Sequence, residues 1–325
     1  TENLFRGVID LVENKAIAFP GSPNSMPVEE AIAEDDKAVA ASYRQALLEK
    51  AAESDDQLML MYLGGQDIPV SQLKAAIRKL TISNHIVPVL CGSALRGKGI
   101  QPLLDAIVDY LPSPLDIPPV HVSKVKGEGI VLCHASDDEP FSALAFKTVS
   151  DPFMGRLTYM RVYSGKVKAG ASILNSTKGE KERLGKLYIM HADRREEVDY
   201  ADAGSIIATL GLKKTSTGDT LCEPTRPVLF EPIRFAQPVL SMAVEPKSKA
   251  DQDKLDDVLT KLTAEDPTFK TYHDQETGQT LISGMGELHL EVLTERMFRE
   301  FGVRVNVGKP QVAYKETITV PVESE

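Results

Sequence analysis

The sequence predicts a multidomain α+β protein with a helix-rich segment, a β-barrel and a ferredoxin-like domain. Three observations predict this class. Residues 1–117 carry apolar side chains at helical spacing, and residues 121–230 carry many short β-type runs between turn signals. Residues 235–313 read as strands and helices in the order β-α-β-β-α-β. The 325 residues are enough for several domains, each with its own core.

The first segment opens with the run FRGVIDLVENKAIAF, whose alternation predicts paired strands around a turn near Glu13–Asn14. The next run, from Pro27 to Glu53, is rich in Ala, Glu and Lys and predicts an acidic helix over 29–53. Ser54 and Ser71 are the expected N-caps of two shorter helices, which a Gly64–Gly65 pair separates.

The stretch CGSALRGKGI, residues 91–100, lies between an apolar run at 85–90 and the run IQPLLDAIVDYLP. This order predicts a strand, a loop of small residues and a helix, and such a loop commonly meets a ligand. Small residues such as Ser93 and Ala94 let a planar base approach the main chain. The Pro-rich run LPSPLDIPPV then predicts the first domain linker.

The phosphate loop pattern G-x-x-x-x-G-K-[ST] matches at none of the glycines. The run from Asn14 to Ile17 begins like the base-reading motif N-K-x-D, but Ile17 stands where that motif needs a carboxylate. The residues around 91–100 are therefore either an ordinary turn or the later part of a longer nucleotide-binding domain.

The second segment contains runs such as SALAFKTV, RLTYMRVYSG and SIIATL, separated by Gly-containing turns, which is a barrel pattern. Because strand side chains alternate between two faces, we expect a core built from alternate residues. These include Leu144, Phe146, Leu157, Val162, Ile173 and Ile207.

The third segment predicts a four-stranded antiparallel sheet with helices near 249–264 and 287–300 on the same face. In the second helix, Leu290 and Leu293 are expected core residues. His289 follows Glu287 and precedes Glu291, and we interpret it as part of a solvated helix face rather than as a catalytic residue.

Composition excludes several classes of protein. Hydrophobic residues make up 42% of the chain, and there is no apolar run long enough for a membrane span. The three cysteines, Cys91, Cys133 and Cys222, are far apart, which favours free thiols in a reducing compartment, and we expect all three to be buried. The six histidines lack the spacing of metal ligands, so no metal site is expected.

Net charge is −10, but its distribution is uneven. Residues 1–120 carry 16 acids and 10 bases, residues 121–230 carry 14 and 16, and residues 231–325 carry 17 and 11. Only the middle segment is basic, at +2. This weak excess is compatible with a nucleic-acid contact, although a solvated face is the simpler explanation of it.

The chain resembles the bacterial elongation factor G family of translational GTPases. The resemblance rests on the runs HASDDEPFSALAFKTVSDPFMGRLTYMRVYSG, MHADRREEV, GLKKTSTGDTL, GMGELHLEVLTERM and VNVGKPQVAYKET, in this order. It implies that residues 1–117 are the helical insertion and the last strand and helix of an α/β GTP-binding domain. Residues 121–230 are then the barrel second domain, 235–313 the ferredoxin-like third domain, and 314–325 the start of a fourth.

The same resemblance implies a fragment of the ribosomal translocation GTPase. GTP, with Mg in the parent, is its cofactor, and Ser93 and Ala94 match the last base-binding loop. Without phosphate ligands we expect this chain to bind no GTP and to hold no catalytic residue. A switch histidine upstream of Thr1 serves hydrolysis in the family.

The implied partners are ribosomal. The barrel faces small-subunit ribosomal RNA, and the basic residues that are candidates for this contact are Lys178, Lys181, Arg183, Lys186, Arg194 and Arg195. The acidic helix is a candidate docking surface for the ribosomal stalk protein. We expect a cytoplasmic monomer that binds neither membranes nor DNA. The alternatives are a sister ribosome-associated GTPase of the ribosome-protection or stress type, and a non-enzymatic ribosome-binding module.

Overall fold

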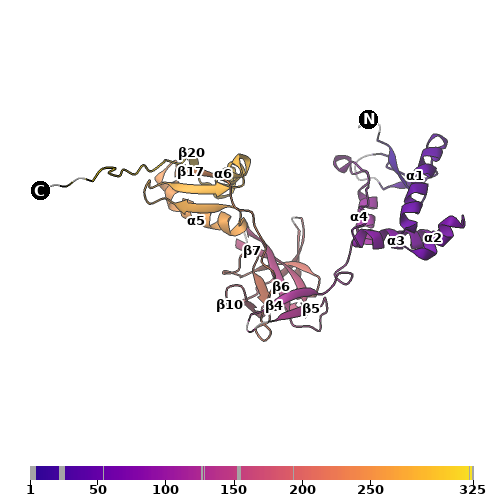
Figure 1. The fold of residues 1–325 in the computed structure, drawn as a ribbon, viewed down its shortest axis with the longest axis horizontal. Coiled ribbons are helices and arrows are strands. Elements are labelled where there is room, and N and C mark those ends of the chain that lie inside the picture. Colours follow the sequence, from indigo (N-terminus) through magenta and orange to yellow (C-terminus); the bar gives the residue numbers. More distant parts are fainter. Residues whose placement is uncertain are drawn as a thin grey trace. The chain divides into compact units, whose positions relative to one another are not determined.

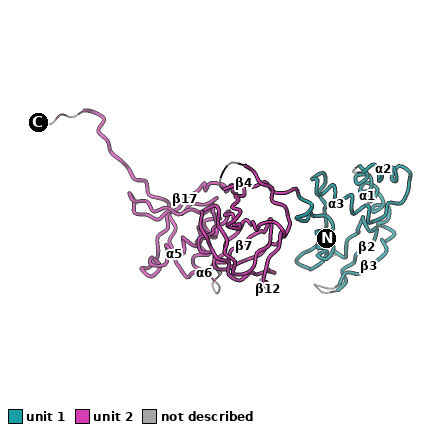
Figure 2. The backbone as a smooth tube through the Cα atoms, turned by 90° about the horizontal axis from the view of Figure 1, so that it is seen from below, with its two compact units in different colours: residues 1–117 teal, residues 118–325 magenta. Residues whose placement is uncertain are grey.

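The computed structural model describes residues 5–21, 26–53, 55–125, 127, 129–151, 155–192, 194–321 and 323. The chain forms two compact units, residues 1–117 and 118–325, which Figure 2 shows in different colours. The first unit has one main hydrophobic core, and the second has separate cores in its barrel and in its third domain. No helix among the described residues has the length and apolar character needed to cross a lipid bilayer.

Unit 1 begins with a three-stranded antiparallel sheet in the order β1-β2-β3. The strands are β1 (Gly7–Asp10), β2 (Lys15–Ala18) and β3 (Val28–Glu30). The predicted turn is confirmed, and Asn14 occupies it with φ of 56°. The prediction of an unbroken helix over 29–53 is wrong at its start, because Glu29 and Glu30 pair with β2. Strand pairing here outweighs the helix propensity of glutamate.

Four helices accompany this sheet among the described residues of unit 1 (Figure 1). They are α1 (Glu34–Ala52), α2 (Asp56–Leu63), α3 (Val70–Ile82) and α4 (Ile100–Tyr110), and a short 3-10 turn, η2 (Ala94–Arg96), precedes the last of them. The core joins residues of α1, α2 and α3 with Tyr110 of α4, and Leu73 is fully buried in it.

The predicted N-caps of α2 and α3 are not the observed ones. Asp55 caps α2, its carboxylate accepting hydrogen bonds from the N–H groups of Gln57 and Leu58 at 2.9 and 3.2 Å. Ser54 lies outside the described residues. Ser71 is inside α3, because that helix starts one residue after Pro69, which has φ of −58° and no N–H group to satisfy.

The strand predicted over 85–90 is wrong. Residues 86–90 form no strand, and Val87 and Val89 are 82% and 85% exposed. A strand needs a partner, and no described strand pairs with these residues. The neighbouring helix α4 is where it was predicted, but its apolar face is also exposed, at Leu103, Leu104, Ile107 and Val108.

The barrel domain of unit 2 contains an antiparallel sheet of eight strands in the order β10-β9-β15-β6-β7-β14-β11-β12. The strands are β6 (Ser142–Asp151), β7 (Gly155–Ser164), β9 (Ser172–Asn175), β10 (Glu180–Arg183), β11 (Leu187–His191), β12 (Arg194–Val198), β14 (Ile206–Leu210) and β15 (Thr220–Cys222). Residues from both halves of this order share one core, so the sheet curves around it.

Two smaller sheets flank this core. One contains β4 (Val120–Lys124), β5 (Ile130–Cys133) and β16 (Val228–Leu229), and the other pairs β8 (Val167–Lys168) with β13 (Tyr200–Ala201). Cys133 and Cys222 are buried beside the first, as predicted, and burial raises the pKa of the Cys222 thiol. Cys91, expected to be buried, is exposed.

The predicted barrel core is partly confirmed. Val162, Ile173 and Ile207 are in the main core, and Leu157 is buried in a smaller cluster beside it. On β6, however, Ala143 and Ala145 face the core, and Leu144 packs against the flanking sheet instead.

A β-bulge explains why Phe146 is not in the core. Ala145 pairs with Met160 and Lys147 pairs with Tyr159, so Phe146 is an extra residue between two paired positions. A bulge changes the alternation of side chains along the strand, and no local sequence signal marked it.

The third domain confirms the β-α-β-β-α-β order. Its elements are β17 (Leu240–Pro246), α5 (Lys249–Glu265), β18 (Lys270–His273), β19 (Thr280–Gly284), α6 (Glu287–Phe301) and β20 (Val305–Gly308), and the sheet order is β18-β19-β17-β20. One core cluster joins Leu259 of α5, Leu293 of α6 and Ile282 of the sheet, so both helices cover the same face. This is the predicted ferredoxin-like fold.

Candidate nucleic-acid interface and base loop

The barrel holds one surface loop with a network of buried polar groups. This loop, residues 211–219, is called here the lysine loop because it presents Lys213 and Lys214. The Glu182 carboxylate accepts hydrogen bonds from the Lys214 N–H group, at 2.8 Å, and from the Thr215 hydroxyl. Glu182 and Thr215 are both buried. A buried carboxylate bonded in this way keeps the loop backbone in one conformation.

Asp219 closes the loop from its other end. One oxygen of its carboxylate accepts from the Ser216 N–H group at 2.7 Å and from the Asn175 side chain at 2.9 Å. Asn175 also donates to the Thr215 hydroxyl at 3.2 Å, which links the two ends. The run TSTGD therefore folds through its own side chains and those of β9 and β10.

Two cations complete the network. Arg156 donates to the carbonyl oxygens of Lys213, at 2.9 Å, and Thr215. Burial lowers the pKa of the Arg156 guanidinium. Lys178 donates to the Lys214 carbonyl at 2.6 Å and pairs with Asp219 at 3.0 Å. These two side chains hold the loop and are not available to a ligand.

The six basic residues predicted to contact RNA differ in what their side chains do. Lys178 points into the loop network, Arg183 donates to the Gly170 carbonyl at 2.9 Å, and Lys186 pairs with Glu197 at 2.8 Å. Lys181 on β10 and Arg194 on β12 are exposed, as is Arg195. Strands β10 and β12 are the first and last in the sheet order and do not pair with each other. Lys181 therefore does not lie beside Arg194 or Arg195 in a pair of adjacent strands.

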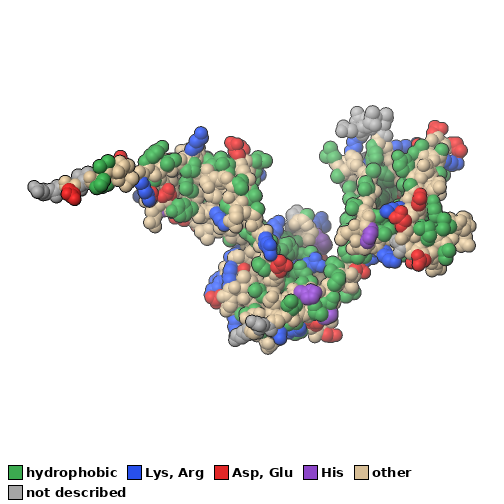
Figure 3. All heavy atoms as spheres, in the orientation of Figure 1, with side chains coloured by type: hydrophobic (Ala, Val, Ile, Leu, Met, Phe, Trp, Pro, Cys, Tyr) green, Lys and Arg blue, Asp and Glu red, His purple; other side chains and the backbone are tan. Residues whose placement is uncertain are grey.

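Two further basic residues of the barrel, Lys213 and Lys214, are not among the predicted contacts. Both are exposed on the lysine loop, and Lys214 pairs with Glu180 at 2.8 Å. Two adjacent lysines followed by the turn run TSTGD were the available signal. A loop with a fixed backbone presents such charges at a lower entropic cost than a mobile one. Figure 3 shows basic side chains on the visible face of the barrel.

The base loop at 91–99 closes on itself. Ser93 and Lys98 form a two-way backbone bridge, with N···O distances of 2.8 and 3.1 Å. Gly92 and Gly99 lie back to back, because a Cβ on Gly92 would meet the Lys98 carbonyl at 2.9 Å and one on Gly99 would meet the Cys91 carbonyl at 2.9 Å. The glycines therefore permit a narrow loop.

This geometry divides the roles of Ser93 and Ala94. The Ser93 N–H group is used by Lys98, and the N–H groups of Arg96 and Gly97 donate within the loop. Ala94 begins η2, so its N–H group has no acceptor inside that turn. Of the two residues predicted to contact a base, Ala94 is the one whose amide has no hydrogen-bond acceptor within the loop.

Glu265 links the barrel to the third domain within unit 2. Its side chain is only 8% exposed. One carboxylate oxygen accepts from the Ser150 N–H group on β6 at 2.7 Å, and the other accepts from Arg296 on α6 at 2.8 Å. Arg296 also makes two hydrogen bonds of 2.8 Å to Glu300, which lower the pKa of the Glu300 carboxyl. A single buried carboxylate thus contacts both domains.

His289 is not on a solvated face, contrary to the prediction. Its Nδ1 atom accepts from the Met285 N–H group at 3.0 Å, so Nε2 carries the proton and donates to Asp266 at 2.9 Å. Gly284 makes room for it, since a Cβ there would lie 2.8 Å from Nδ1. The histidine fixes the entry of α6 against the end of α5, which is a structural role.

Helix α1 begins with an acidic turn. Glu34, Asp35 and Asp36 occupy its first turn, where negative charge interacts favourably with the helix dipole. Glu29 and Glu30, predicted to belong to this helix, instead pair on β3 with Lys15 and Arg6 at 2.7 and 3.0 Å. Helix α1 keeps an exposed acidic start.

No group of three or more His, Cys, Asp or Glu side chains among the described residues has the arrangement of a metal site.

A barrel followed by a ferredoxin-like domain, joined by a buried carboxylate, defines the chain as one of the translation-factor type. Residues 140–224 match the family model "Elongation factor G domain 2", and residues 235–309 match "Elongation Factor G, domain III". The chain belongs to the elongation factor G family.

Two relatives support this assignment. Elongation factor G from Dehalococcoides mccartyi is 51% identical over 321 residues, which are 99% of this chain and 46% of that protein. A crystal structure of a protein from Thermus thermophilus is 30% identical with a TM-score of 0.75, and the match covers 94% of this chain and 43% of that one. The chain thus spans just under half the length of each of these relatives.

Proposed function

We propose that this chain is the part of a ribosomal translocation GTPase that lies between the nucleotide centre and the later domains. It contacts ribosomal RNA and transmits the nucleotide state, and it does not perform hydrolysis itself. The observation that carries the proposal is the lysine loop, a family-specific run whose backbone is fixed by Glu182, Asp219 and Arg156. A rigid loop that presents lysines suits a phosphate backbone.

The domain division proposed with this function follows the family. Residues 1–117 are the helical insertion and the last part of the GTP-binding domain, 121–230 the second domain, 235–313 the third, and 314–325 the start of the fourth. Residues 86–90, which pair with no described strand, and the exposed apolar face of α4 support the first assignment. An apolar segment and a helix that together leave apolar side chains uncovered are typical of one edge of an α/β layer.

GTP, with Mg in the whole protein, is the proposed cofactor. The residues of this chain fit only the guanine base of GTP. The Ala94 amide, which has no acceptor within the loop, lies in a narrow glycine loop where a purine edge can approach. When bound, the nucleotide supplies the phosphate whose state the other domains sense. Ser93 holds the loop closed through Lys98, and Ala94 offers the contact.

Transmission between domains is assigned to Glu265. Because its two oxygens contact β6 of the barrel and Arg296 of α6, a shift of one domain changes the bonding of the other. The proposed partners are the ribosome, with small-subunit RNA on the barrel and the stalk protein on the acidic start of α1, in the cytoplasm.

The test is ribosome pelleting at low and moderate salt. We expect the wild-type chain to bind ribosomes at low salt. Changing Lys181, Arg194 and Lys213 together to Glu should abolish this binding. The matched control changes Lys249, Lys254 and Lys309 to Glu, which is the same charge change on exposed residues of the third domain. Each phosphate contact contributes about 0.7–0.9 to the slope of log K against log salt, so a wild-type slope of a few units is expected. Equal binding by both triple variants would refute the barrel as the RNA-facing domain.

A sister GTPase of the ribosome-protection or stress type, or a non-enzymatic ribosome-binding module, is the alternative. The gene sequence upstream of Thr1 separates the enzymes from the module, since only a GTPase requires a phosphate loop there. The match to elongation factor G domains 2 and III favours the translocation factor over a sister enzyme.

A further inference from the structure

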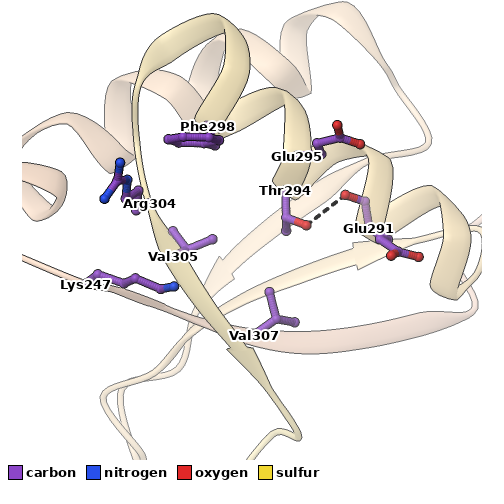
Figure 4. Close-up of a pocket in the computed structure, with 8 residues that line it drawn as sticks. All are labelled: Lys247, Glu291, Thr294, Glu295, Phe298, Arg304, Val305 and Val307. Atoms are coloured by element: carbon purple, nitrogen blue, oxygen red, sulfur yellow. Dashed lines mark hydrogen bonds between the residues drawn. The ribbon is translucent and has the colours of Figure 1, made fainter.

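The third domain has a groove of about 490 Å³ between α6 and the edge of its sheet (Figure 4). Val305 and Val307 form its apolar floor on the strand side, and Glu291, Thr294, Glu295 and Phe298 form the wall on α6. Phe298 and Val307 are 48% and 45% exposed, which is high for a phenylalanine and a valine on packed elements. We call this site the β20 groove.

The floor of the groove ends at an open strand edge. β20 is the last strand in the sheet order and pairs only with β17 among the described strands. The Lys247 N–H group donates to the Arg304 carbonyl at 3.0 Å. Bonded pairs alternate with unbonded pairs in an antiparallel ladder, so the N–H and C=O groups of Val305 and Val307 face away from β17. They are available to a further strand.

The charges around the groove are separated by sign. Glu291 and Glu295 lie one turn apart on α6, and Lys247 and Arg304 lie at the opposite side (Figure 4). No ion pair among the described residues engages Glu291, Lys247 or Arg304, and the Arg304 guanidinium instead lies over the Phe298 ring at 5.0 Å. The groove therefore offers an unpaired acid at one end and unpaired cations at the other.

The residues that follow β20 do not fill this groove. The Gln311 N–H group donates to the Gln279 side chain at 2.8 Å, and Lys315 pairs with Glu276 at 2.7 Å. Glu276 and Gln279 belong to the turn between β18 and β19, at the other edge of the sheet order. The chain that leaves β20 is thus directed toward that turn.

We propose that the β20 groove binds an extended segment of a partner polypeptide by strand addition. The segment pairs through its backbone with Val305 and Val307, and its alternate apolar side chains cover the groove floor. A basic side chain meets Glu291 at one end, and an acidic side chain meets Lys247 and Arg304 at the other. This proposal rests on the third domain alone and is independent of the RNA contact.

The probe is a fluorescein-labelled ten-residue peptide with valines at alternate positions, a lysine at one end and an aspartate at the other. Fluorescence anisotropy with the intact chain should show saturable binding. The same peptide with N-methyl groups on the residues that pair with β20 should bind at least about tenfold more weakly, because methylation removes the ladder donors. Equal binding of the two peptides, or no binding at about 1 mM peptide, would overturn the proposal.

Charge specificity is tested by substitution and rescue. Glu291→Lys should weaken the binding of the lysine-ended peptide about three- to fivefold. A peptide with glutamate in place of that lysine should bind the variant with the original affinity. Asp253→Lys is the control, with the same charge change at an exposed position on α5. If Asp253→Lys weakens peptide binding as much as Glu291→Lys does, the charge of Glu291 does not contribute specifically to binding in the groove.

A second copy of the chain is the competing occupant, because free edges also pair with each other. Sedimentation equilibrium distinguishes a partner peptide from a second copy of the chain as the occupant of the groove. A monomer that binds the peptide supports the proposal, and a dimer that the peptide fails to dissociate overturns it.

Discussion

Gly284 and His289 show how two residues of one motif depend on each other. A Cβ at position 284 would lie 2.7 Å from Cδ2 of Leu290 and 2.8 Å from Nδ1 of His289. Because Leu290 is fully buried, it has no space to move into. The glycine therefore allows the histidine to bond the Met285 N–H group and the leucine to enter the core.

Gly284→Ala should destabilise the third domain by about 1–3 kcal/mol, since an added methyl group overpacks this corner. Denaturant unfolding of the intact chain, followed by a third-domain probe, measures the loss. Gly308→Ala is the control, because a Cβ there meets nothing within 4 Å. Equal losses from both would show that crowding at His289 is not the cause.

Leu290→Ala and Leu293→Ala should each lower the free energy of unfolding by about 2–5 kcal/mol. Both side chains are buried against the sheet, so truncating either one leaves a cavity. His289→Ala should cost less, about 1–2 kcal/mol, for two partly exposed hydrogen bonds. Guanidinium melts give the three values. If His289→Ala lowers the free energy of unfolding as much as the leucine variants do, the hydrogen bonds to Met285 and Asp266 stabilise the third domain more than their partial exposure indicates.

Asp266 makes the third domain sensitive to acid. Burial raises its pKa, but hydrogen bonds from Thr268 and His289 outweigh this effect, so the pKa lies below its usual value. A carboxyl with a lowered folded pKa stabilises the fold above its unfolded pKa of about 3.9, and the contribution is lost as pH falls through the folded value.

The difference in unfolding free energy between wild type and Asp266→Asn should therefore be constant above about pH 5 and shrink below about pH 4. Urea melts from about pH 3 to about pH 7 follow it. A difference that grows as the pH falls would mean that the sign of the pKa shift is opposite.

At the scale of elements, α5 carries the link between domains. Its last residue, Glu265, is nearly buried and bonds both β6 and α6, while the segment 231–239 that joins the two domains has no regular structure. The side-chain bonds rather than the connecting segment therefore restrain the third domain on the barrel.

Glu265→Ala should increase the rate of proteolysis within 231–239 and lower the melting temperature of the third domain, at a cost of about 1–3 kcal/mol for the lost charged bonds. Limited proteolysis with mass mapping measures the first effect. Glu300→Ala is the matched control, because it removes the other partner of Arg296 and leaves the bond to Ser150. Similar proteolysis in both variants would exclude Glu265 as the link.

For the whole molecule, we expect the chain to bind no GTP measurably. Nucleotide affinity depends mainly on phosphate and metal ligands, and the base contact proposed for this chain is a single amide, that of Ala94. A titration with a fluorescent guanine nucleotide should stay flat, with a full-length relative as the positive control. A micromolar dissociation constant would contradict the assignment of the loop as a partial site.

The sequence by itself determined the order of elements in the third domain, the position of α4 and the family. These features depend on local periodicity and on contiguous motifs, which a single chain displays directly. The bounds of α5 and α6 agree with prediction within one residue, because Ser248 caps α5 and Gly302 ends α6 in the left-handed region.

Only the tertiary structure decided which polar residues serve the fold and which face solvent. Lys178, Arg183 and Lys186 had the same sequence signal as Lys181, yet their side chains are engaged by carbonyls or carboxylates from other strands and loops. Glu265 likewise bonds residues 31 and 115 positions away, and the bulge at Phe146 depends on its pairing with β7. Such pairings follow from strand register and domain packing, and no local pattern encodes them.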